Sequence, residues 1–456
     1  MEQNTFSRIR LWCPRPLGTY SQNKQCCISV KKTTGDARSK ESEASCSENL
    51  PPAPANPGGG DAAPGDGQGE EGRVMLDTWY VIKPGNTKEK IAFFVAHQCG
   101  VGGSSRSNAV KVKGNWSTDG TKPKRRRKSH DPAKGRPFEH KPKSVMSSQV
   151  RHLISLIDFQ RLWNIFLVPM LIERYPGSEG IKLVRQHIQG HLESLLAQWT
   201  VELDTFEDST PHGMLVFSNI VATLDPSARR RLVLACHYDS KYFPRDDQGR
   251  VYVGATDSAV PCSMMLELAR SLDKELVKHK GKKLDLTLQM LFLDGEEALV
   301  SWTPTDSLYG SRHLAERMSR TKHPVNTAST TLIDSVDMFV LLDLLGVAKP
   351  VFLNHFKDTA QWFNRLVGIE KRLHNLGLLQ LHPLEVTYFN GNTYYGPIED
   401  DHVPFLRKGV PILHLISTPF PRVWHTMDDT AENLHPPTIE NLCKILSVFL
   451  MEYLGL

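Results

Sequence analysis

The sequence predicts an α/β fold over residues 148–456, with a mostly parallel central sheet covered by helices on both faces. Apolar runs typical of buried strands alternate with amphipathic runs typical of helices, at the spacing of β-α-β units. Several apolar runs also end in His, Asp or Glu, the pattern of a ligand crevice at the carboxyl edge of such a sheet. This segment is long enough to bury one large core.

Two helices open the segment. Residues 152–175 form an apolar helix with a break at Pro169, because proline lacks the amide donor that a helix needs. Residues 181–199 are amphipathic at helical spacing. The predicted strands that follow are 215–224, 231–238, 287–294, 337–344 and 410–416, and the predicted helices are 261–279, 307–320, 357–377 and 437–453.

Residues 1–147 have a different composition, rich in Gly, Pro, Ser, Lys and Arg, and we expect them to be largely disordered. Residues 51–72 are of low complexity. Residues 122–128, KPKRRRK, carry six cations in seven residues. They are either a nuclear localisation signal or nucleic-acid-binding patch, or part of a solvated tail. The net charge of +5 comes largely from such stretches, so we expect no nucleic-acid binding by the folded part.

One N-terminal segment is not of low complexity. Residues 74–99 hold two β-like runs around a Pro-Gly-Asn turn, which predicts a hairpin or a motif that orders on a partner. Residues 70–130 resemble a segment of F-box-only proteins, although no F-box is visible. This resemblance implies a fused or mis-joined chain. It also leaves a non-catalytic adaptor, acting through residues 1–147, as one alternative function.

Targeting signals and cysteines point to different compartments. No stretch reaches the roughly 20 apolar residues of a membrane span, and no signal-peptide core is visible, so the chain as written is expected in the cytoplasm or nucleus. Cys236 and Cys262 flank two predicted strand ends and could meet across the sheet. They would form either a disulfide, which indicates an oxidising compartment, or two buried thiols.

The residues at the strand ends carry the chemistry. One such residue would be a cap or a surface group, but the whole set favours a zinc hydrolase-like site, since zinc takes imidazole nitrogens and carboxylate oxygens and keeps one position open in catalytic sites. The adjacent Glu296 and Glu297 can divide the work, one binding metal and the other acting as general base. The full set is His237, Asp239, Asp257, Glu296, Glu297, Asp343 and His425.

These motifs resemble those of a known family. Their order along the chain resembles the zinc aminopeptidase-like superfamily. Their detailed sequences resemble the animal glutaminyl-peptide cyclotransferases, and within these the Golgi-resident, membrane-anchored form. The motifs are ACHYDSK (235–241), GATDSAVPC (254–262), FLDGEEA (292–298), DSLYGSRHLA (306–315), EDDHVPFLRKGVPILHLI (399–416) and PFPRVWHT (419–426).

The resemblance implies a role for each matching residue. A single zinc per chain would be held by Asp257, Glu297 and His425, with Glu296 as general acid/base. Asp343 and Asp400 would form a hydrogen-bonded carboxylate pair beside the site. The implied substrate-pocket residues are Trp302, Phe420, Trp424 and His414, with Glu399 at the rim, and the implied disulfide joins Cys236 to Cys262.

The implied activity is cyclisation of N-terminal glutamine, and more slowly glutamate, of peptides and proteins to pyroglutamate, with release of ammonia from glutamine. The resemblance also implies residence in the Golgi, although the membrane anchor of that form is not visible in this chain. A two-zinc aminopeptidase of the same fold remains an alternative, with His237 and Asp239 as ligands of the second ion. Metal stoichiometry separates the two enzymes.

Overall fold

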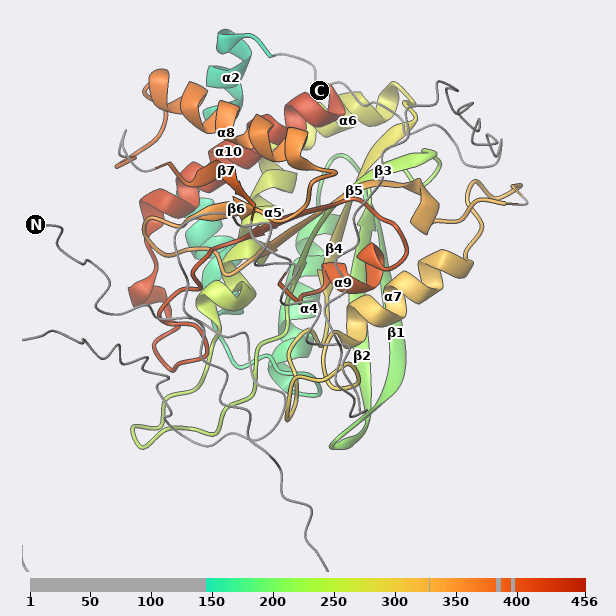
Figure 1. The fold of residues 1–456 in the computed structure, drawn as a ribbon, viewed down its shortest axis with the longest axis vertical. Helices are drawn as coiled ribbons and strands as arrows, with labels where there is room; N and C mark the ends of the chain where they lie inside the picture. Colours follow the sequence, from blue (N-terminus) through green and yellow to red (C-terminus); the bar gives the residue numbers. More distant parts are fainter. Residues whose placement is uncertain (1–144, 328, 383–386, 395–397) are drawn as a thin grey trace, which may run out of the picture. The chain divides into compact units, whose positions relative to one another are not determined.

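The computed structural model describes residues 145–456, apart from residue 328 and the segments 383–386 and 395–397. Its centre is a six-stranded sheet in the order β1-β2-β4-β3-β5-β8 (Figure 1). The strands are β1 (Thr200–Thr210), β2 (Gly213–Thr223), β3 (Arg230–His237), β4 (Leu286–Leu293), β5 (Val336–Asp343) and β8 (Ile412–Ile416). The predictions for 51–72, 74–99, 122–128 and 70–130 lie outside the described residues.

The sheet is parallel in its centre and antiparallel at one edge. Strands β4, β3, β5 and β8 pair in parallel, while β1, β2 and β4 pair antiparallel. The four parallel strands therefore end at the same edge, with His237 paired to Leu293 and Asp343 paired to Ile416. A separate two-stranded sheet joins β6 (Phe352–Asn354) to β7 (Phe389–Tyr394).

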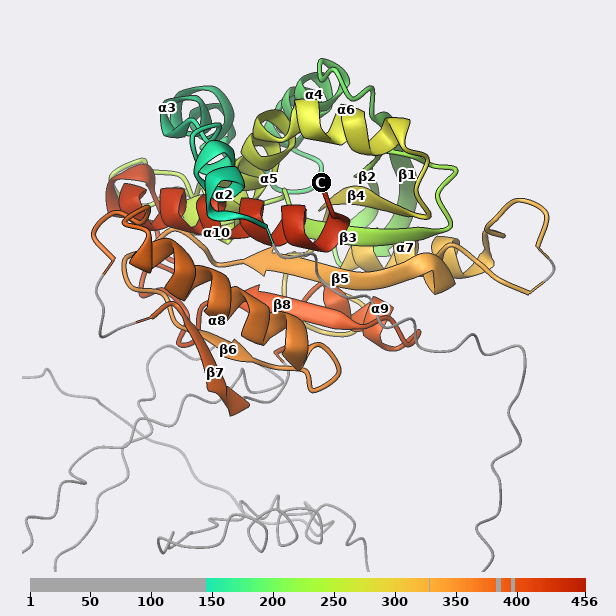
Figure 2. The same ribbon diagram turned by 90° about the horizontal axis from the view of Figure 1, so that it is seen from above.

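Helices cover both faces of the sheet (Figure 2). On one face lie α4 (Glu179–Glu193), α5 (Val260–Ser271), α6 (Asp273–Gly281) and α10 (Pro436–Leu454), with α8 (Ala360–Asn375) packed against α10. On the other lie α7 (Tyr309–Arg320) and α9 (His402–Leu406). The remaining helical elements are α2 (Ser147–Ile154), α3 (Phe159–Arg161), η1 (Leu162–Leu167), η2 (Val168–Met170), η3 (Ala255–Ala259), η4 (Ile333–Ser335) and η5 (Ala431–Asn433).

Alternation along the buried strands divides the core between the two faces. On β3, Leu232 and Leu234 belong to the larger cluster under α5 and α10, while Val233 and Ala235 belong to the cluster under α7 and α9. Both sets are buried because successive strand residues point to opposite faces of the sheet. This explains why the central strands are continuous apolar runs in the sequence.

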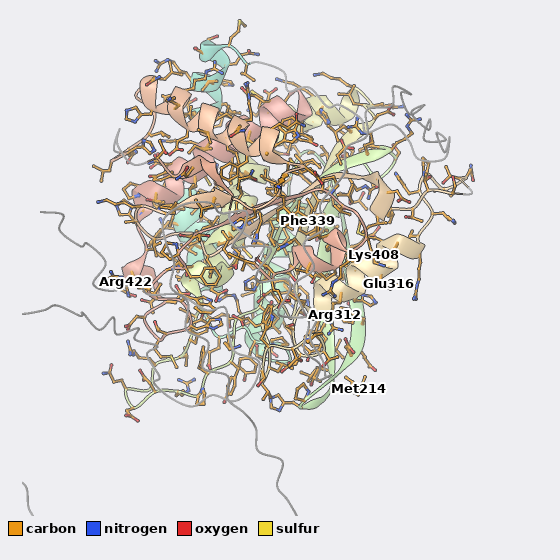
Figure 3. All side chains as sticks on the ribbon, viewed as in Figure 1. Met214, Arg312, Glu316, Phe339, Lys408 and Arg422 are labelled. Carbon is orange, nitrogen blue, oxygen red and sulfur yellow. The ribbon has the colours of Figure 1, made fainter. Side chains whose placement is uncertain are left out.

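Ring packing and an ion pair hold α9 on the face of the sheet that carries the smaller core cluster. Phe405 of α9 packs on Phe339 of β5 with ring centroids 4.4 Å apart. Lys408, just after α9, donates to Glu316 of α7 at 2.6 Å, and Figure 3 shows the two side chains close together. These contacts fix α9, and therefore the residues just before and within it, against the carboxyl edge of the sheet.

The predicted fold class is confirmed, but some elements differ from prediction. The predicted helix 261–279 divides at Leu272, where the carboxylate of Asp273 accepts the amides of Leu196 and Ala197, both at 2.8 Å. Strand β1 was not predicted, because it lies at the sheet edge with only Asp204 buried. The helix predicted over 181–199 ends at Glu193.

One expectation about membrane spans needs correction. The 24 residues Ser147–Met170 have the length and apolar composition of a span, contrary to the sequence prediction. The core helix of a soluble protein passes the same test. In the structure this segment is divided into α2, α3, η1 and η2, and its buried residues, among them Leu153, Leu162 and Phe166, belong to the large core cluster.

Candidate active site

Polar side chains from separate loops meet at the carboxyl edge of the sheet. The ligand atoms of Asp257, Glu297 and His425 lie within 4.8 Å of one another. His425 Nε2 is 2.8 Å from Glu297 Oε1 and 3.3 Å from Asp257 Oδ2. All three side chains are at most 9% exposed. Two carboxylates and one imidazole converging in this way can hold a metal ion such as zinc.

The Asp257 loop depends on a glycine. Gly254 has φ +47°, and a Cβ at this position would lie 2.3 Å from the carbonyl oxygen of Asp257, so only glycine fits. The Tyr252 hydroxyl donates to Asp257 Oδ2 at 3.1 Å. The loop therefore folds back tightly. Its Asp257 Oδ2 contacts both the Tyr252 hydroxyl and His425 Nε2.

A fully buried arginine supports this loop from below. Arg174 is 0% exposed and donates through Nη2 to the carbonyl oxygens of Gly254 (2.9 Å) and Asp257 (3.2 Å). Its Nη1 donates to the carbonyl of Val253, and its Nε donates to Tyr238 at 2.9 Å. One rigid guanidinium thus joins the end of β3 to the loop that carries Asp257.

Asp429 ties the same loop to the loop of His425. Its carboxylate accepts the amide of Thr256 at 2.9 Å, and its carbonyl accepts the amide of Ala255 at 3.1 Å. Burial, and then the charge of Asp257, raise the pKa of Asp429 to about 7. Neither Arg174 nor Asp429 was predicted from the sequence. Asp429 is the second of two aspartates that follow His425 in WHTMDD (424–429), a visible signal, whereas nothing around Arg174 distinguishes it from a surface arginine.

Asp239 orients the Glu-Glu pair. Its two oxygens accept the amides of Glu296 and Glu297, both at 3.2 Å. Its Oδ1 also lies 3.4 Å from His237 Nδ1. Lys241 donates to Glu297 Oε2 at 3.2 Å and thereby neutralises part of its charge. Asp239 therefore fixes the backbone from which both glutamates project.

A second group of ligand atoms adjoins the first. His237, Asp257 and Asp343 also lie within 4.8 Å of one another, with His237 Nε2 3.2 Å from Asp257 and 3.4 Å from Asp343. This differs from the set predicted for a second ion, His237 with Asp239. The oxygens of Asp239 accept backbone amides, so Asp343 is the carboxylate that completes the group.

The neighbouring glutamates have opposite electrostatic environments. Burial, and then the negative charge of Glu297, raise the pKa of Glu296 well above its ordinary value. Burial alone would also raise the pKa of Glu297, but the charges of His425 and Lys241 outweigh it and lower this pKa to about 2. Glu297 is thus held as an anion, as a metal ligand must be, while Glu296 can exchange a proton.

Asp343 and Asp400 form a second pair of coupled carboxyls. Burial, and then the charge of Asp400, raise the pKa of Asp343 to about 7. Burial raises the pKa of Asp400 to about 7 as well. Asp343 accepts the Ser258 hydroxyl at 2.5 Å, and Asp400 pairs with His414 Nε2 at 2.7 Å. Near neutral pH these two sites therefore hold fewer than two negative charges.

Residues 219–450 match Peptidase family M28. The glutaminyl-peptide cyclotransferase-like protein of Bos taurus is 58% identical over 313 residues, which covers 69% of this chain and 80% of the relative. The glutaminyl-peptide cyclotransferase of Gloydius blomhoffii is 55% identical over 323 residues, which covers 70% of this chain and 88% of the relative. This chain belongs to the glutaminyl-peptide cyclotransferase family.

Solved structures agree. The glutaminyl cyclase of Macrostomum lignano, 38% identical, aligns with a TM-score of 0.62 over 69% of this chain and 95% of its own. A Zn-dependent exopeptidase of Parabacteroides distasonis, 20% identical, aligns with a TM-score of 0.50 over 65% of this chain and 98% of its own, which shows the shared fold alone. The cyclotransferase family therefore uses the sheet of zinc exopeptidases. The resemblance of residues 70–130 to F-box-only proteins stays a prediction.

The aromatic residues expected to line the cyclotransferase pocket lie on two loops. Trp302 donates through its indole nitrogen to Glu399 at 3.0 Å, so the loop after β4 meets the segment before α9. Phe420 and Trp424 pack edge to face with ring centroids 5.0 Å apart, and Trp424 stacks on His425 with ring centroids 4.1 Å apart. Their roles in substrate binding stay a prediction.

The predicted Cys236–Cys262 disulfide is not formed in the structure. The two sulfurs are 3.2 Å apart, both cysteines are free thiols, and both side chains are buried. A disulfide needs a separation of about 2.05 Å. The structure therefore brings the two cysteines together, as predicted for either alternative, and the disulfide itself stays a prediction.

Proposed function

We propose that this chain is a zinc-dependent glutaminyl-peptide cyclotransferase that converts N-terminal glutamine of peptides and proteins to pyroglutamate and releases ammonia. The observation that carries the proposal is the pairing of Glu296 with the Asp257, Glu297 and His425 group. One glutamate is held as an anion among ligand atoms, and its neighbour has a raised pKa. The family relationship supplies the substrate class.

The donor set fits one zinc ion per chain. Asp257, Glu297 and His425 supply two carboxylate oxygens and one imidazole nitrogen, the ligand types that zinc takes in catalytic sites. Asp239 fixes the backbone of Glu297, and Arg174 fixes the loop of Asp257, so the ligands are preorganised. When bound, zinc would polarise the side-chain carbonyl of the substrate glutamine.

Glu296 is the proton carrier. It would take a proton from the attacking α-amine of the substrate and give it to the departing amide nitrogen, so one carboxylate serves both half-steps. Its raised pKa suits this exchange near neutral pH. Asp343 and Asp400, both with a pKa of about 7, together carry fewer than two negative charges near neutral pH and so limit the negative charge beside Glu296. The hydrogen bond between them that the resemblance implies stays a prediction.

The pocket has a modest task because the attack is intramolecular. The α-amine and the side-chain amide belong to one residue, so the enzyme mainly has to hold the glutamine side chain folded back. We assign this holding to Trp302, Phe420 and Trp424, with His414 as a further pocket residue and Glu399 at the rim. The link from Trp302 to Glu399 supports the assignment.

A two-zinc aminopeptidase is the second candidate, and one observation favours it. His237, Asp257 and Asp343 form a group of ligand atoms beside the first, with Asp257 common to both. A second tightly bound zinc in the purified protein would support this candidate and would assign ligand roles to His237 and Asp343.

Two further assignments rest on sequence alone. Golgi residence follows from the resemblance to the membrane-anchored form. An adaptor role would need binding by residues 1–147, and it predicts that this segment by itself captures the partner of the full chain.

Metal removal tests the proposal. Dialysis against a chelator should abolish pyroglutamate formation from a Gln-initiated peptide, and one equivalent of zinc should restore it. A Glu-initiated peptide should react far more slowly, because a hydroxide-like oxygen leaves less readily than ammonia here. Full activity of the metal-free protein would contradict the assignment of Asp257, Glu297 and His425 as zinc ligands.

A further inference from the structure

A second polar cluster lies behind Asp400, between α9 and β8. The ligand atoms of Asp400, His402 and His414 lie within 4.8 Å of one another. His402 is 0% exposed, and Asp400 and His414 are 2% exposed. The ring centroids of His402 and His414 are 4.5 Å apart, and His355 adds a third imidazole 5.5 Å from His414. The proposed reaction uses Asp400 but gives His402 no task.

Three ring nitrogens in this cluster lack hydrogen-bond partners. They are both nitrogens of His402 and Nδ1 of His414, a statement that covers the described residues only. A buried polar atom without a partner costs about 1–3 kcal/mol, and such atoms usually mark a bound water or ion. Three of them in one buried cluster therefore indicate that a water molecule or a metal ion occupies it.

The hydrogen bond to Asp400 prepares His414 as a ligand. His414 Nε2 pairs with Asp400 Oδ2 at 2.7 Å. When Asp400 is ionised it accepts this hydrogen bond, and the neutral ring then has its proton on Nε2 and its lone pair on Nδ1. A carboxylate that accepts from one ring nitrogen while the other faces a metal is the usual second layer of a metal site. Burial, and then the neighbouring imidazoles, lower the pKa of His402, which keeps its ring neutral and able to ligate.

We propose that His402 and His414, with Asp400, form a second binding site for a zinc-class transition metal ion, separate from the Asp257, Glu297 and His425 group. Imidazole nitrogens select zinc, cobalt and nickel over magnesium and calcium, which prefer oxygen. Two ligand atoms of a tetrahedral zinc lie about 3.3 Å apart. His402 and His414 each offer a ring nitrogen within 4.8 Å of the other, so the two imidazole ligands need only a small closing movement, with Asp400 holding His414 from the second layer.

Occupation of this site would inhibit the enzyme. Asp400, which the proposed reaction uses, would be held in place by its hydrogen bond to the metal-bound His414. This consequence rests on the proposed function, whereas the binding itself does not. Excess zinc should therefore lower turnover after the first equivalent has restored it.

Cobalt titration of the full chain tests the binding. Protein carrying one equivalent of zinc is titrated with Co²⁺, and bound cobalt is followed by visible absorption and by equilibrium dialysis. The test variant is His402→Phe, which keeps a ring but removes both nitrogens. The matched control is His212→Phe, which removes an exposed imidazole at the turn between β1 and β2.

The parent and His212→Phe should each bind one more cobalt per chain than His402→Phe. Equal stoichiometry in all three proteins would overturn the proposal and leave water as the occupant. The test compares cobalt stoichiometry between proteins. An ion bound at the His237, Asp257 and Asp343 group is therefore counted in each protein and does not change the difference. If His402→Phe does not fold, as judged by thermal unfolding, His402→Leu replaces it with the same expectation.

Activity supplies the second arm. The zinc concentration that halves turnover should rise at least about tenfold in His402→Phe, as expected for the loss of one ligand. An unchanged inhibition profile, together with the loss of one cobalt, would overturn the inhibitory role. A parent with no cyclase activity would refute the proposed function, while the cobalt stoichiometry would still decide the binding.

Discussion

Glu296 and Glu297 are neighbours in the chain with different chemical environments. Asp239 accepts both of their amides, so their backbones are fixed together. Beyond the backbone they diverge: Glu297 contacts Lys241 and His425, whereas burial, and then the neighbouring carboxyls, raise the pKa of Glu296. The sequence allows one glutamate to bind metal and the other to transfer protons. The two distinct sets of contacts support this division.

The isosteric variants of this pair separate proton transfer from metal binding. Glu296→Gln keeps the side-chain shape and the three ligands, so zinc content should match the parent while turnover falls by roughly 10²–10⁴. Glu297→Gln should instead lose zinc, because an amide binds a divalent cation less well than a carboxylate. Elemental analysis and turnover are measured on both proteins. Zinc loss in Glu296→Gln with retention in Glu297→Gln would reverse the two roles.

Most of the residues brought together at the site follow from sequence patterns, and the supporting residues do not. His237, Asp257, Glu297 and His425 come at or after strand ends, and parallel strands bring their ends to one edge. Arg174 acts through carbonyl oxygens of a loop some eighty residues away, a contact that no local pattern encodes. The sequence likewise could not show that Asp239 accepts amides and Asp343 faces His237.

At the scale of elements, η3 is the segment whose position depends most on a single side chain. Its loop contains a left-handed glycine, Gly254, and carries Asp257. Arg174 satisfies three carbonyl oxygens of residues 253–257 from within the core. Removal of the guanidinium would take this donor from the carbonyls of Val253 and Asp257, while the carbonyl of Gly254 keeps the amide of Ala259 at 3.2 Å.

Arg174→Met should therefore weaken zinc binding as well as the fold. We expect a loss of about 2–4 kcal/mol in the free energy of unfolding, from unsatisfied buried carbonyls, and a zinc affinity weaker by roughly 10–100-fold. Urea unfolding of the metal-free protein and competition with a chelator measure the two effects. Added guanidinium ion at low concentration should restore part of the zinc affinity. Parent-like affinity in folded Arg174→Met would show that the loop holds its shape unaided.

The β1 and β2 hairpin was missed in part because its attachment is polar. Asp204 is the one buried residue of β1, and it accepts from Asn219 (2.9 Å), His313 (3.1 Å) and Arg317 (2.8 Å). Burial alone would raise the pKa of Asp204, but the hydrogen bonds from Arg317 and Asn219 outweigh it and lower this pKa below 3.8. An exposed edge strand held by one carboxylate has little of the apolar alternation that predicts strands.

This contact makes part of the stability depend on pH. Since the folded pKa of Asp204 is lower than the unfolded one, its stabilisation is present above pH 4 or so and disappears as pH falls through the folded pKa. Asp204→Asn should cost about 1–3 kcal/mol at pH 7 and progressively less in acid. Glu207→Gln, at an exposed position of the same strand, is the control. A cost for Asp204→Asn that does not change with pH would contradict the ionic contribution.

At the scale of the whole molecule, the same sheet edge is compatible with two activities, cyclisation and peptide hydrolysis. The peptidase fold supplies parallel strands with polar ends, and the Asp257, Glu297 and His425 group lies directly beside the His237, Asp257 and Asp343 group. The fold alone therefore does not choose between cyclisation and hydrolysis. We expect the choice to depend on Trp302, Glu399, Phe420 and Trp424, which would close the pocket around a folded-back glutamine.

Metal content gives the first whole-molecule prediction. Protein purified without added metal should carry one zinc per chain, and His425→Ala and Asp257→Ala should each carry none. Inductively coupled plasma analysis after gel filtration gives the ratio. Two zincs that survive gel filtration would support the aminopeptidase.

The product formed from a single peptide tests the central claim most directly. A peptide that begins with Gln-Leu is incubated with the zinc-loaded full chain and followed by mass spectrometry and an ammonia assay. Cyclisation predicts a peptide of unchanged length that has lost one ammonia and no longer reacts with amine reagents, with ammonia appearing in equal amount. Free glutamine and a peptide that begins with Leu, without any pyroglutamyl product, would contradict the account and establish an aminopeptidase.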